Sequence, residues 1–339
     1  MRTKICLLGE AWGVEEERAQ APFVGTAGYE LNRMLSDAGI HRADCFLTNT
    51  FNLHPPGNKL EAFCGTKDQA LPGYPALVKG KHISAGFAPE LNRLAEELVA
   101  HDPNIIIALG NTAMWALLGK TAITKFRGTT ELSTHTAVGY KVLPTYHPSY
   151  IIRGQWALRP VVILDLQKAL RESEYPELRR PQREIWIEPS LEDIREFIER
   201  YLRPSPVISV DIETSGSIIT CIGFASGPGH AIVIPFTKPS RKDRSYWPTH
   251  AAEREAWVLV KGVLELPNRK LFQNGLYDIA FLWRAMGLKV LGAEHDSMLL
   301  HHSLQPESLK SLGFLGSIYT DEGPWKNMRK HTTTIKGFS

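Results

Sequence analysis

The chain has 339 residues, of which 43% are hydrophobic and 22% charged, a composition that excludes a disordered or fibrous protein. At roughly 100–200 residues per domain, this length predicts two domains. The 39 Lys and Arg residues exceed the 36 Asp and Glu residues by only three, which excludes a generally basic nucleic-acid coat and leaves local contacts through loops and helix ends. No apolar run approaches the roughly 18 residues that span a bilayer, and the short apolar start is unlike a signal peptide. We therefore expect no membrane partner and a cytoplasmic location.

The four cysteines, Cys6, Cys45, Cys64 and Cys221, lie far apart and form no C-x-x-C motif. A zinc ribbon or an iron–sulfur site therefore has little support. Free thiols in a reducing compartment are the expected state.

Residues 1–174 alternate short apolar strands with amphipathic helices, which predicts a parallel sheet covered by helices on both faces. In chain order, strands are expected at 4–9, 45–49, 105–110 and 141–145, and helices at 27–38, 91–98, 112–118 and 161–171. Ligands bind at the carboxyl ends of the strands in such sheets, and Glu10, Asn49 and His147 follow three of these ends. The Pro- and Gly-rich segment 54–86 is a long loop, of a length that is uncommon unless the loop is functional.

The charged, proline-punctuated segment 175–189 is the expected linker. After it, three strands with short Gly/Ser turns predict an antiparallel meander, which is followed by helices. The strands are expected at 207–214, 218–226 and 231–236, and the helices at 252–264, 276–286 and 297–304. A second domain is therefore expected over 190–325, with a tail over 326–339.

Four motifs follow one another in the first half. They are Gly9-Glu10-Ala11-Trp12-Gly13, Pro22-Phe23-Val24-Gly25-Thr26-Ala27-Gly28, Thr48-Asn49 with Pro55-Pro56-Gly57-Asn58, and His147-Pro148-Ser149-Tyr150. A glycine-rich loop alone is as compatible with a structural turn as with a binding site. Taken together, the four resemble the uracil-DNA glycosylase superfamily, most closely its family 4 and the glycosylase-like region of phage DNA polymerase-related proteins. The resemblance implies a three-layer α/β/α domain around a central parallel sheet.

The resemblance also implies a reaction, in which a uracil flipped out of DNA is cut from its sugar without a covalent lysine intermediate. Phe23 is then the aromatic floor of the base pocket, and Asn49 recognises the edge of the base with its amide. His147 hydrogen-bonds O2 of the base, where negative charge develops. Glu10 positions water and stabilises the sugar cation. Glu16 stands where the family excludes the 5-methyl group of thymine.

Further residues are assigned to substrate and DNA by the same resemblance. Backbone close to the base is expected at Gly9, Ala11 and Gly25. Contacts with DNA are expected from Ser149, with Ile151 and Ile152 as candidate wedges that fill the vacated base stack. Taken singly, each site residue also has an ordinary interpretation as a core aromatic or aliphatic residue, a turn asparagine, a loop histidine or a solvated acid. The combination of residues carries the hypothesis.

The sequence departs from the family 4 pattern in two respects. Family 4 proteins hold an iron–sulfur cluster with four cysteines, which the cysteines of this chain do not match. We therefore expect no cluster and no cofactor for the glycosylase. Trp12 replaces the usual proline in the first motif, and Ala19-Gln20-Ala21 replaces a polar-glycine-basic stretch. Both changes leave reaction rate and base specificity open.

Two carboxylates, Asp211 and Glu213, lie two residues apart on an apolar strand and so on one face of it. Buried carboxylates are costly unless they bind metal or protons. Asp278, four residues after Asn274, adds a third, and such oxygen ligands suit Mg²⁺ or Mn²⁺. This half resembles the 3′–5′ exonuclease domain of family A DNA polymerases, with its D-x-E and N-x-x-x-D motifs and a ribonuclease H-like α/β fold. The alternative is that the two strand residues are ordinary edge-strand acids.

The third exonuclease motif, a tyrosine followed by an aspartate on a helix, is missing, because Tyr319-Thr320-Asp321-Glu322 comes too early. The domain is then truncated, completed by another chain, or a DNA-binding remnant. Our first hypothesis is a uracil-DNA glycosylase fused to this partial domain, which acts on single- or double-stranded DNA beside a DNA polymerase in a bacterial host or phage-infected cell. The alternatives are a non-catalytic DNA- or uracil-binding fragment of a phage replication polymerase, and a metal-dependent exonuclease completed by another chain.

Overall fold

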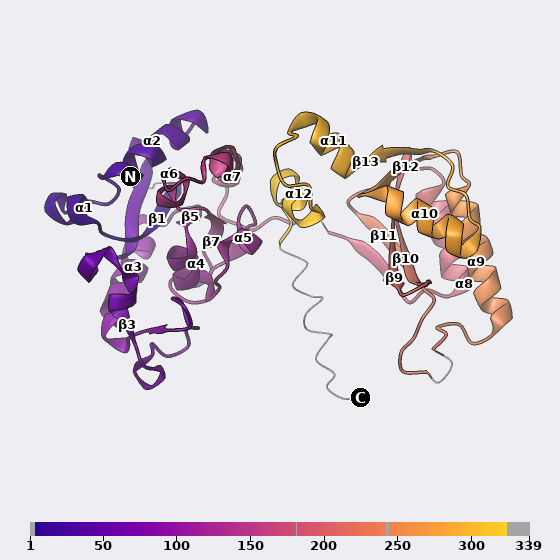
Figure 1. Ribbon diagram of the computed structural model, residues 1–339, viewed down its shortest axis with the longest axis horizontal. Coiled ribbons are helices and arrows are strands. Elements are labelled where there is room, and N and C mark those ends of the chain that lie inside the picture. Colours follow the sequence, from indigo (N-terminus) through magenta and orange to yellow (C-terminus); the bar gives the residue numbers. More distant parts are fainter. Residues whose placement is uncertain (1–3, 181, 242–243, 324–339) are drawn as a thin grey trace. The chain divides into compact units, whose positions relative to one another are not determined.

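The computed structural model describes residues 4–180, 182–241 and 244–323 of the chain (Figure 1). It divides into two compact units. The first combines Met1–Arg179 with Gly313–Ser339, and the second is Arg180–Leu312. Among the helices of the described residues, none has the length and apolar character that crossing a membrane requires.

The first unit is built on a five-stranded sheet with the order β2-β1-β5-β7-β6. Strands β2, β1, β5 and β7 are parallel, which confirms the predicted parallel sheet, and β6 is antiparallel at one edge. The bounds are β1 Ile5–Ala11, β2 Cys45–Phe51, β5 Ile105–Leu109, β6 Glu131–Leu132 and β7 Lys141–Thr145. The strand order reverses between β1 and β5, and this is the point at which open α/β sheets bind their ligands.

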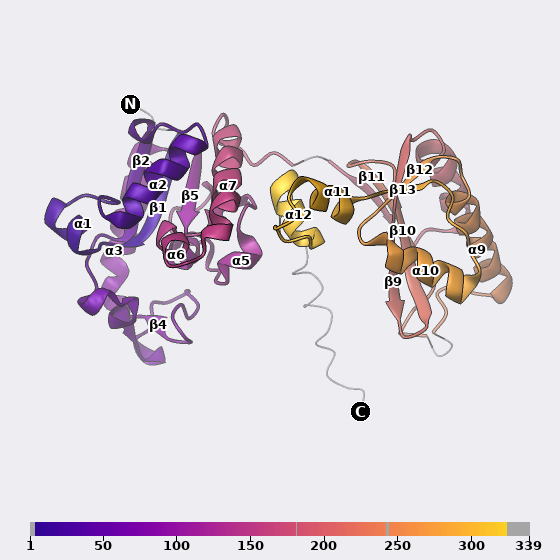
Figure 2. The same ribbon diagram turned by 45° about the horizontal axis from the view of Figure 1, so that its top comes forward.

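Helices cover both faces of this sheet, as the alternation of side chains along its strands requires. Ile5 and Leu7 of β1 enter one core, and Cys6 and Leu8 enter the other. The first core also takes side chains from α2, α6 and α7, which Figure 2 shows on the same side of the sheet. The second takes side chains from α3 and α4. The helix bounds are α1 Val14–Ala19, α2 Thr26–Asp37, α3 Ala88–His101, α4 Asn111–Leu118, α5 Ile123–Phe126, α6 Pro148–Ile152 and α7 Arg159–Glu172.

The long segment 54–86 is folded against the second core. It contains three short 3₁₀ turns and an antiparallel pair, β3 (Cys64–Gly65) with β4 (His82–Ile83). Its apolar side chains, among them Phe63, Leu71 and Ile83, are buried in that core. The predicted loop is therefore an ordered part of the domain.

The second unit is built on a six-stranded sheet with the order β13-β12-β9-β10-β11-β8. The β9-β10-β11 meander is antiparallel, as predicted, and β12 and β13 continue the sheet in parallel with β9. This order gives the ribonuclease H-like α/β fold. The strand bounds are β8 Glu184–Ile187, β9 Val207–Ser215, β10 Ile218–Ala225, β11 His230–Pro235, β12 Arg269–Phe272 and β13 Ala293–Asp296.

The core of the second unit lies between this sheet and its helices. Ile208, Val210 and Ile212 alternate along β9 and face the core, together with apolar residues of α8 and α9. Asp211 and Glu213, which flank Ile212 in the sequence, are exposed on the other face. The helix bounds are α8 Leu191–Phe197, which continues as a π-helical turn Ile198–Leu202, then α9 His250–Leu264, α10 Gly275–Met286 and α11 Ser297–Leu304.

Two segments differ from the expected organisation. The predicted linker contains β8, which pairs in parallel with β11 and extends the second sheet. The predicted second domain, in turn, contains α12 (Leu312–Tyr319), whose Phe314 and Leu315 are buried in the core of the first unit. Its apolar side chains need a core to cover them, and the first unit supplies it. The expected tail at 326–339 lies outside the described residues.

Candidate functional site

The candidate residues of the first unit gather at the carboxyl edge of its sheet. Glu10 lies near the end of β1 and Asn49 lies in β2, which pairs with β1. Gly110 follows β5, and His147 follows β7. These four ends are neighbours in a parallel sheet, so the strand order places the side chains side by side.

Gly9 allows two of the predicted base-recognition residues to meet. A Cβ atom at this position would lie 2.1 Å from Asn49 Oδ1 and 2.5 Å from Phe23 Cζ. Both distances are far below ordinary contact, so the two side chains fill the space that a larger residue would take. At Gly9 the backbone is therefore approached closely by the side chains of Phe23 and Asn49, and the predicted contact of this backbone with the base remains a prediction.

The Phe23 ring is nearly buried, with 5% of its surface exposed. Its backbone has φ +54°, a left-handed conformation that is uncommon for a large residue and that clusters at functional sites. The ring stacks on the imidazole of His147 with 6.0 Å between ring centroids and 28° between planes. The strained loop thus holds an aromatic face beside the histidine.

The His147 imidazole has a defined proton arrangement. The residue caps α6, and its Nδ1 atom accepts a hydrogen bond from the Ser149 backbone N–H at 3.1 Å. Burial lowers the pKa of His147, and Arg153 lowers it further, while Glu10 and Glu16 oppose the shift. A neutral ring that accepts at Nδ1 carries its proton on Nε2. The geometry therefore assigns Nε2–H as a donor available to a ligand.

The Glu10 carboxylate is held by a partner that the sequence analysis missed. Thr112, buried in the first turn of α4, donates from Oγ1 to Glu10 Oε2 at 2.5 Å. This contact fixes one carboxylate oxygen. Thr112 lies three residues after the end of β5, and no local pattern pointed to it. Asn111, one residue earlier, is the first residue of α4, and its side chain accepts from the Ile123 backbone N–H.

Glu16 joins the two loops of the site. Its Oε1 atom accepts from the backbone N–H groups of Val24 and Gly25, at 3.1 and 2.8 Å. Its Oε2 atom accepts from Gly13 N–H at 3.1 Å. Glu16 thus organises the first loop and the start of α2, where Gly25 is the N-cap residue. Its contact with the 5-methyl group of a base remains a prediction, as does the substrate contact of Ala11, the last residue of β1.

The main chain of Asn49 is held in place by a hydrogen bond from Arg93. Arg93 of α3 donates from Nη2 to the Asn49 carbonyl at 2.8 Å, and Glu90 and Glu97 pair with the same guanidinium at 3.2 and 2.8 Å. Asn49 itself is 3% exposed. No hydrogen bond joins its side-chain amide to another of the described residues, so the amide can recognise a base. No local pattern pointed to Arg93, which lies 44 residues away in the sequence.

One of the two predicted wedges is wrong. Ile151 is fully buried in the core of the first unit, because the short helix α6 turns this residue toward α2. Ile152 is half-buried, and Ser149 contacts His147 through Oγ at 2.8 Å from Nδ1. The surface around this turn is formed by other residues, namely Tyr150, Arg153 and Trp156, which are exposed.

The predicted metal ligands of the second unit are not brought together as a metal site. Among the described residues, no group of three or more His, Cys, Asp and Glu side chains is placed to hold a metal ion. Asp278 is 5% exposed and accepts from the Ile212 backbone N–H at 3.1 Å. Desolvation raises the pKa of Asp278 to about 6, with a smaller contribution from Asp211. Its buried carboxyl therefore supports the β9 backbone, while Asp211 and Glu213 stay on the exposed face.

The cysteines do not fit an iron–sulfur cluster either. Cys6 and Cys45 are buried, Cys64 is half-buried, and Cys221 belongs to β10 of the second unit. Burial raises the pKa of the Cys6 thiol well above its usual value, which disfavours the thiolate that a metal requires. No step is therefore assigned to such a group.

Comparison with known proteins identifies the family of the first unit. Residues 1–171 match the family described as the uracil DNA glycosylase superfamily. A type-4 uracil-DNA glycosylase of Thermotoga maritima is 34% identical over 170 residues, covering 49% of this chain and 76% of that protein. The corresponding enzyme of Saccharolobus solfataricus is 33% identical over 175 residues, covering 49% and 70%. The chain belongs to the uracil-DNA glycosylase superfamily.

The second unit has structural neighbours among nucleases. NrnC of Brucella melitensis matches with a TM-score of 0.29 and 17% identity, over 42% of this chain and 63% of that one. Escherichia coli RNase D matches with a TM-score of 0.29 and 16% identity, over 41% of this chain and 33% of that one. Since the matches span less than two thirds of both nucleases and the scores are low, the ribonuclease H-like fold is assigned from the strand order alone.

Proposed function

We propose that the first unit excises uracil from DNA by hydrolysis of the N-glycosidic bond. The observation that carries the proposal is the gathering of Glu10, Phe23, Asn49 and His147 at one sheet edge, with a neutral imidazole that presents Nε2–H. The relatives named above, which are called type-4 uracil-DNA glycosylases, support the same chemistry.

In this proposal each residue has a distinct task. The base, flipped out of the stack, lies against Phe23, and the Asn49 amide donates to its O4 and accepts from its N3–H. As the bond to the sugar breaks, negative charge develops on the base, and His147 Nε2–H donates to O2. A preorganised donor of this kind stabilises the transition state more than the ground state.

Glu10 acts on the sugar side of the bond. Its carboxylate, oriented by Thr112, holds the attacking water and stabilises the positive charge on the sugar. Because Thr112 occupies one of the two carboxylate oxygens, the other is available for the water. No metal takes part in any of these steps.

Contact with DNA is assigned to the surface beside the α6 turn. Arg153 is exposed there and supplies a positive charge for phosphate, and Tyr150 and Trp156 present aromatic faces on which bases can stack. Ile152 remains the candidate wedge. The proposal includes neither a polymerase partner nor a phage origin, because the matched relatives are bacterial and archaeal glycosylases.

A uracil-release assay tests the proposal. The full chain is incubated in EDTA with a labelled oligonucleotide that carries one uracil, single-stranded or paired, and abasic sites are cleaved with alkali. Cleavage at the uracil, absent with a thymine control, is expected. Asn49→Ala abolishes it, whereas Asn32→Ala, an exposed asparagine on α2, does not. Equal activity of the two variants overturns the assignment of the site.

A non-catalytic binding module is the second candidate, favoured by Trp12 in the catalytic loop. The Trp12 indole Nε1 atom is buried without a hydrogen-bond partner, so the substitution is not compensated locally. Binding of the uracil oligonucleotide without release of the base supports this candidate. Restored release in Trp12→Pro then identifies the loop as the cause.

A further inference from the structure

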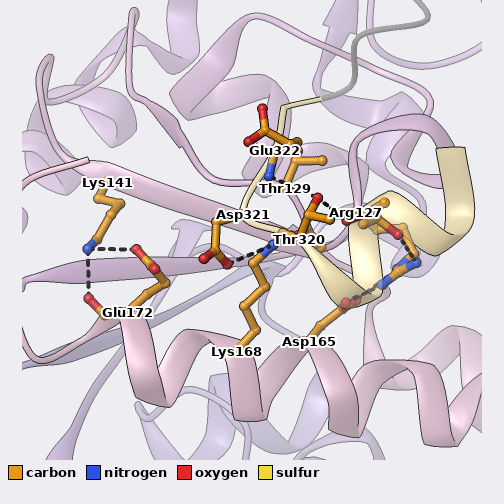
Figure 3. A network of polar contacts seen from close by, with 12 residues as sticks. Arg127, Thr129, Lys141, Asp165, Lys168, Glu172, Thr320, Asp321 and Glu322 are labelled. Atoms are coloured by element: carbon orange, nitrogen blue, oxygen red, sulfur yellow. Dashed lines mark hydrogen bonds and ion pairs between the residues drawn. The ribbon is translucent and has the colours of Figure 1, made fainter. Parts of the chain in front are cut away.

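The chain returns to the first unit after it has completed the second. Helix α12 places Phe314 and Leu315, 8% and 5% exposed, in the same core as Tyr146 and Ile151. Figure 3 shows this returning segment, with Thr320 and Asp321, beside α7. Tyr319, Thr320 and Asp321, which come too early in the sequence for the third exonuclease motif, therefore belong to the first unit.

Two buried cationic side chains of the first unit donate hydrogen bonds to this segment. Arg127, 2% exposed, forms an ion pair with Asp165 of α7 and donates from Nη1 to Ser317 Oγ at 2.8 Å. Lys168 lies on α7 one turn after Asp165. It donates to the Thr320 carbonyl at 2.6 Å and forms an ion pair with Asp321 at 3.6 Å. Figure 3 shows both side chains pointing at the segment. Buried charges of this kind are stable only when all their partners are in place.

The same two cations hold the end of β7. Asp165, the partner of Arg127, accepts from Thr145 Oγ1 at 2.6 Å. Lys168 also donates to the Gly128 carbonyl at 2.7 Å, and Gly128 N–H donates to the Pro144 carbonyl at 2.8 Å. Pro144 and Thr145 are the last residues of β7. Two chains of hydrogen bonds therefore lead from the returning segment to the strand end that precedes His147.

We propose that the segment Leu312–Asp321 is a positioning element of the uracil site, which acts through Arg127 and Lys168 on the end of β7 and so on His147. The inference rests on the proposed function for its catalytic consequence. Ser317 accepts a hydrogen bond from Arg127. Arg127 in turn holds Asp165, and Asp165 holds Thr145. Catalytic geometry must be held to about half an ångström, and a bond network of this kind supplies that rigidity from a segment remote in sequence.

The experiment compares Ser317→Ala with Ser303→Ala in the full chain. Ser303 is an exposed serine of α11 whose hydroxyl donates to the Leu299 carbonyl, so it is a matched control in the second unit. Uracil release is measured at saturating enzyme, and affinity for the uracil oligonucleotide is measured separately. We expect Ser317→Ala to lower the single-turnover rate about 10-fold, with affinity within twofold of the wild type, and Ser303→Ala to change neither.

A second measurement follows His147 itself. Histidine-selective ¹⁵N NMR, with the His147 signals identified by their loss in His147→Gln, reports the proton arrangement of the ring. Ser317→Ala is expected to shift these signals, and Ser303→Ala is not. The inference is overturned if folded Ser317→Ala releases uracil at the wild-type rate and its His147 signals are unshifted. It is also overturned if Ser317→Ala changes only the thermal stability of the chain. If the wild-type chain releases no uracil, the proposed function fails, and the NMR result alone decides the positioning role.

Discussion

Substituting Gly9 by alanine is expected to disable the glycosylase without unfolding it. The new Cβ atom would lie 2.1 Å from Asn49 Oδ1, which is about 1.3 Å short of the 3.4 Å at which ordinary contact begins, and 2.5 Å from Phe23 Cζ. Both residues that receive the base must therefore move. A displacement of about 1 Å costs roughly 100-fold in rate, or about 2.7 kcal/mol in activation free energy. The cost in stability for such overpacking is about 1–3 kcal/mol.

Single-turnover release of uracil from a labelled oligonucleotide measures the rate, and thermal unfolding measures the stability. The matched control is Gly223→Ala on β10, where a Cβ atom would have its nearest neighbours at 3.9 Å. This control should release uracil at the wild-type rate. A folded Gly9→Ala chain with a rate within threefold of the wild type would refute the placement of Asn49 and Phe23 at the base.

Three further predictions concern the titration of His147 and Asp278 and the hydrogen bonds of Arg93. Burial lowers the pKa of His147, and the neutral ring is the active form. The rate of uracil release should therefore stay constant as pH falls to 6.5 and decline only below that value. A midpoint above 6.5 in the pH–rate profile contradicts this prediction. The folded-state pKa of Asp278, about 6, lies above its unfolded value, so its ionisation costs stability as pH rises through 6. Asp278→Asn keeps the acceptor for Ile212 and should raise the melting temperature at pH 8 but not at pH 4; equal effects at both would exclude this cause. Arg93→Lys loses the forked contacts that brace Asn49 and should lower kcat about 10-fold, and an unchanged kcat would show that the brace is dispensable.

Much of the first unit follows from local sequence. The strands around Ile105 and Lys141 are short apolar runs, and their parallel pairing follows from the helices between them. Because parallel strands share one carboxyl edge, the clustering of Glu10, Asn49 and His147 was predictable from the order of motifs alone. The hydrogen-bond partners of these residues were not, since Thr112 and Arg93 carry no local signature.

The wrong predictions have physical causes as well. Ile151 and Ile152 are adjacent on a five-residue helix, and sequence alone does not say which of them faces the core. The carboxylates of β9 alternate with core residues, so an apolar strand carries them on its exposed face. The contact between Arg127 and Ser317 joins residues 190 positions apart, and tertiary packing across such a distance leaves no periodic trace in the sequence.

The divided first unit has a consequence for the order in which the protein folds during synthesis. Chains leave the ribosome from their N-terminus, and domains generally fold as units as they emerge. The second unit is one continuous segment, Arg180–Leu312, and is available in full before the first unit has received Phe314 and Leu315. Until those residues emerge, Arg127 and Lys168 are without their partners in α12 and the residues after it. The unit whose synthesis begins first is therefore the one whose core closes last.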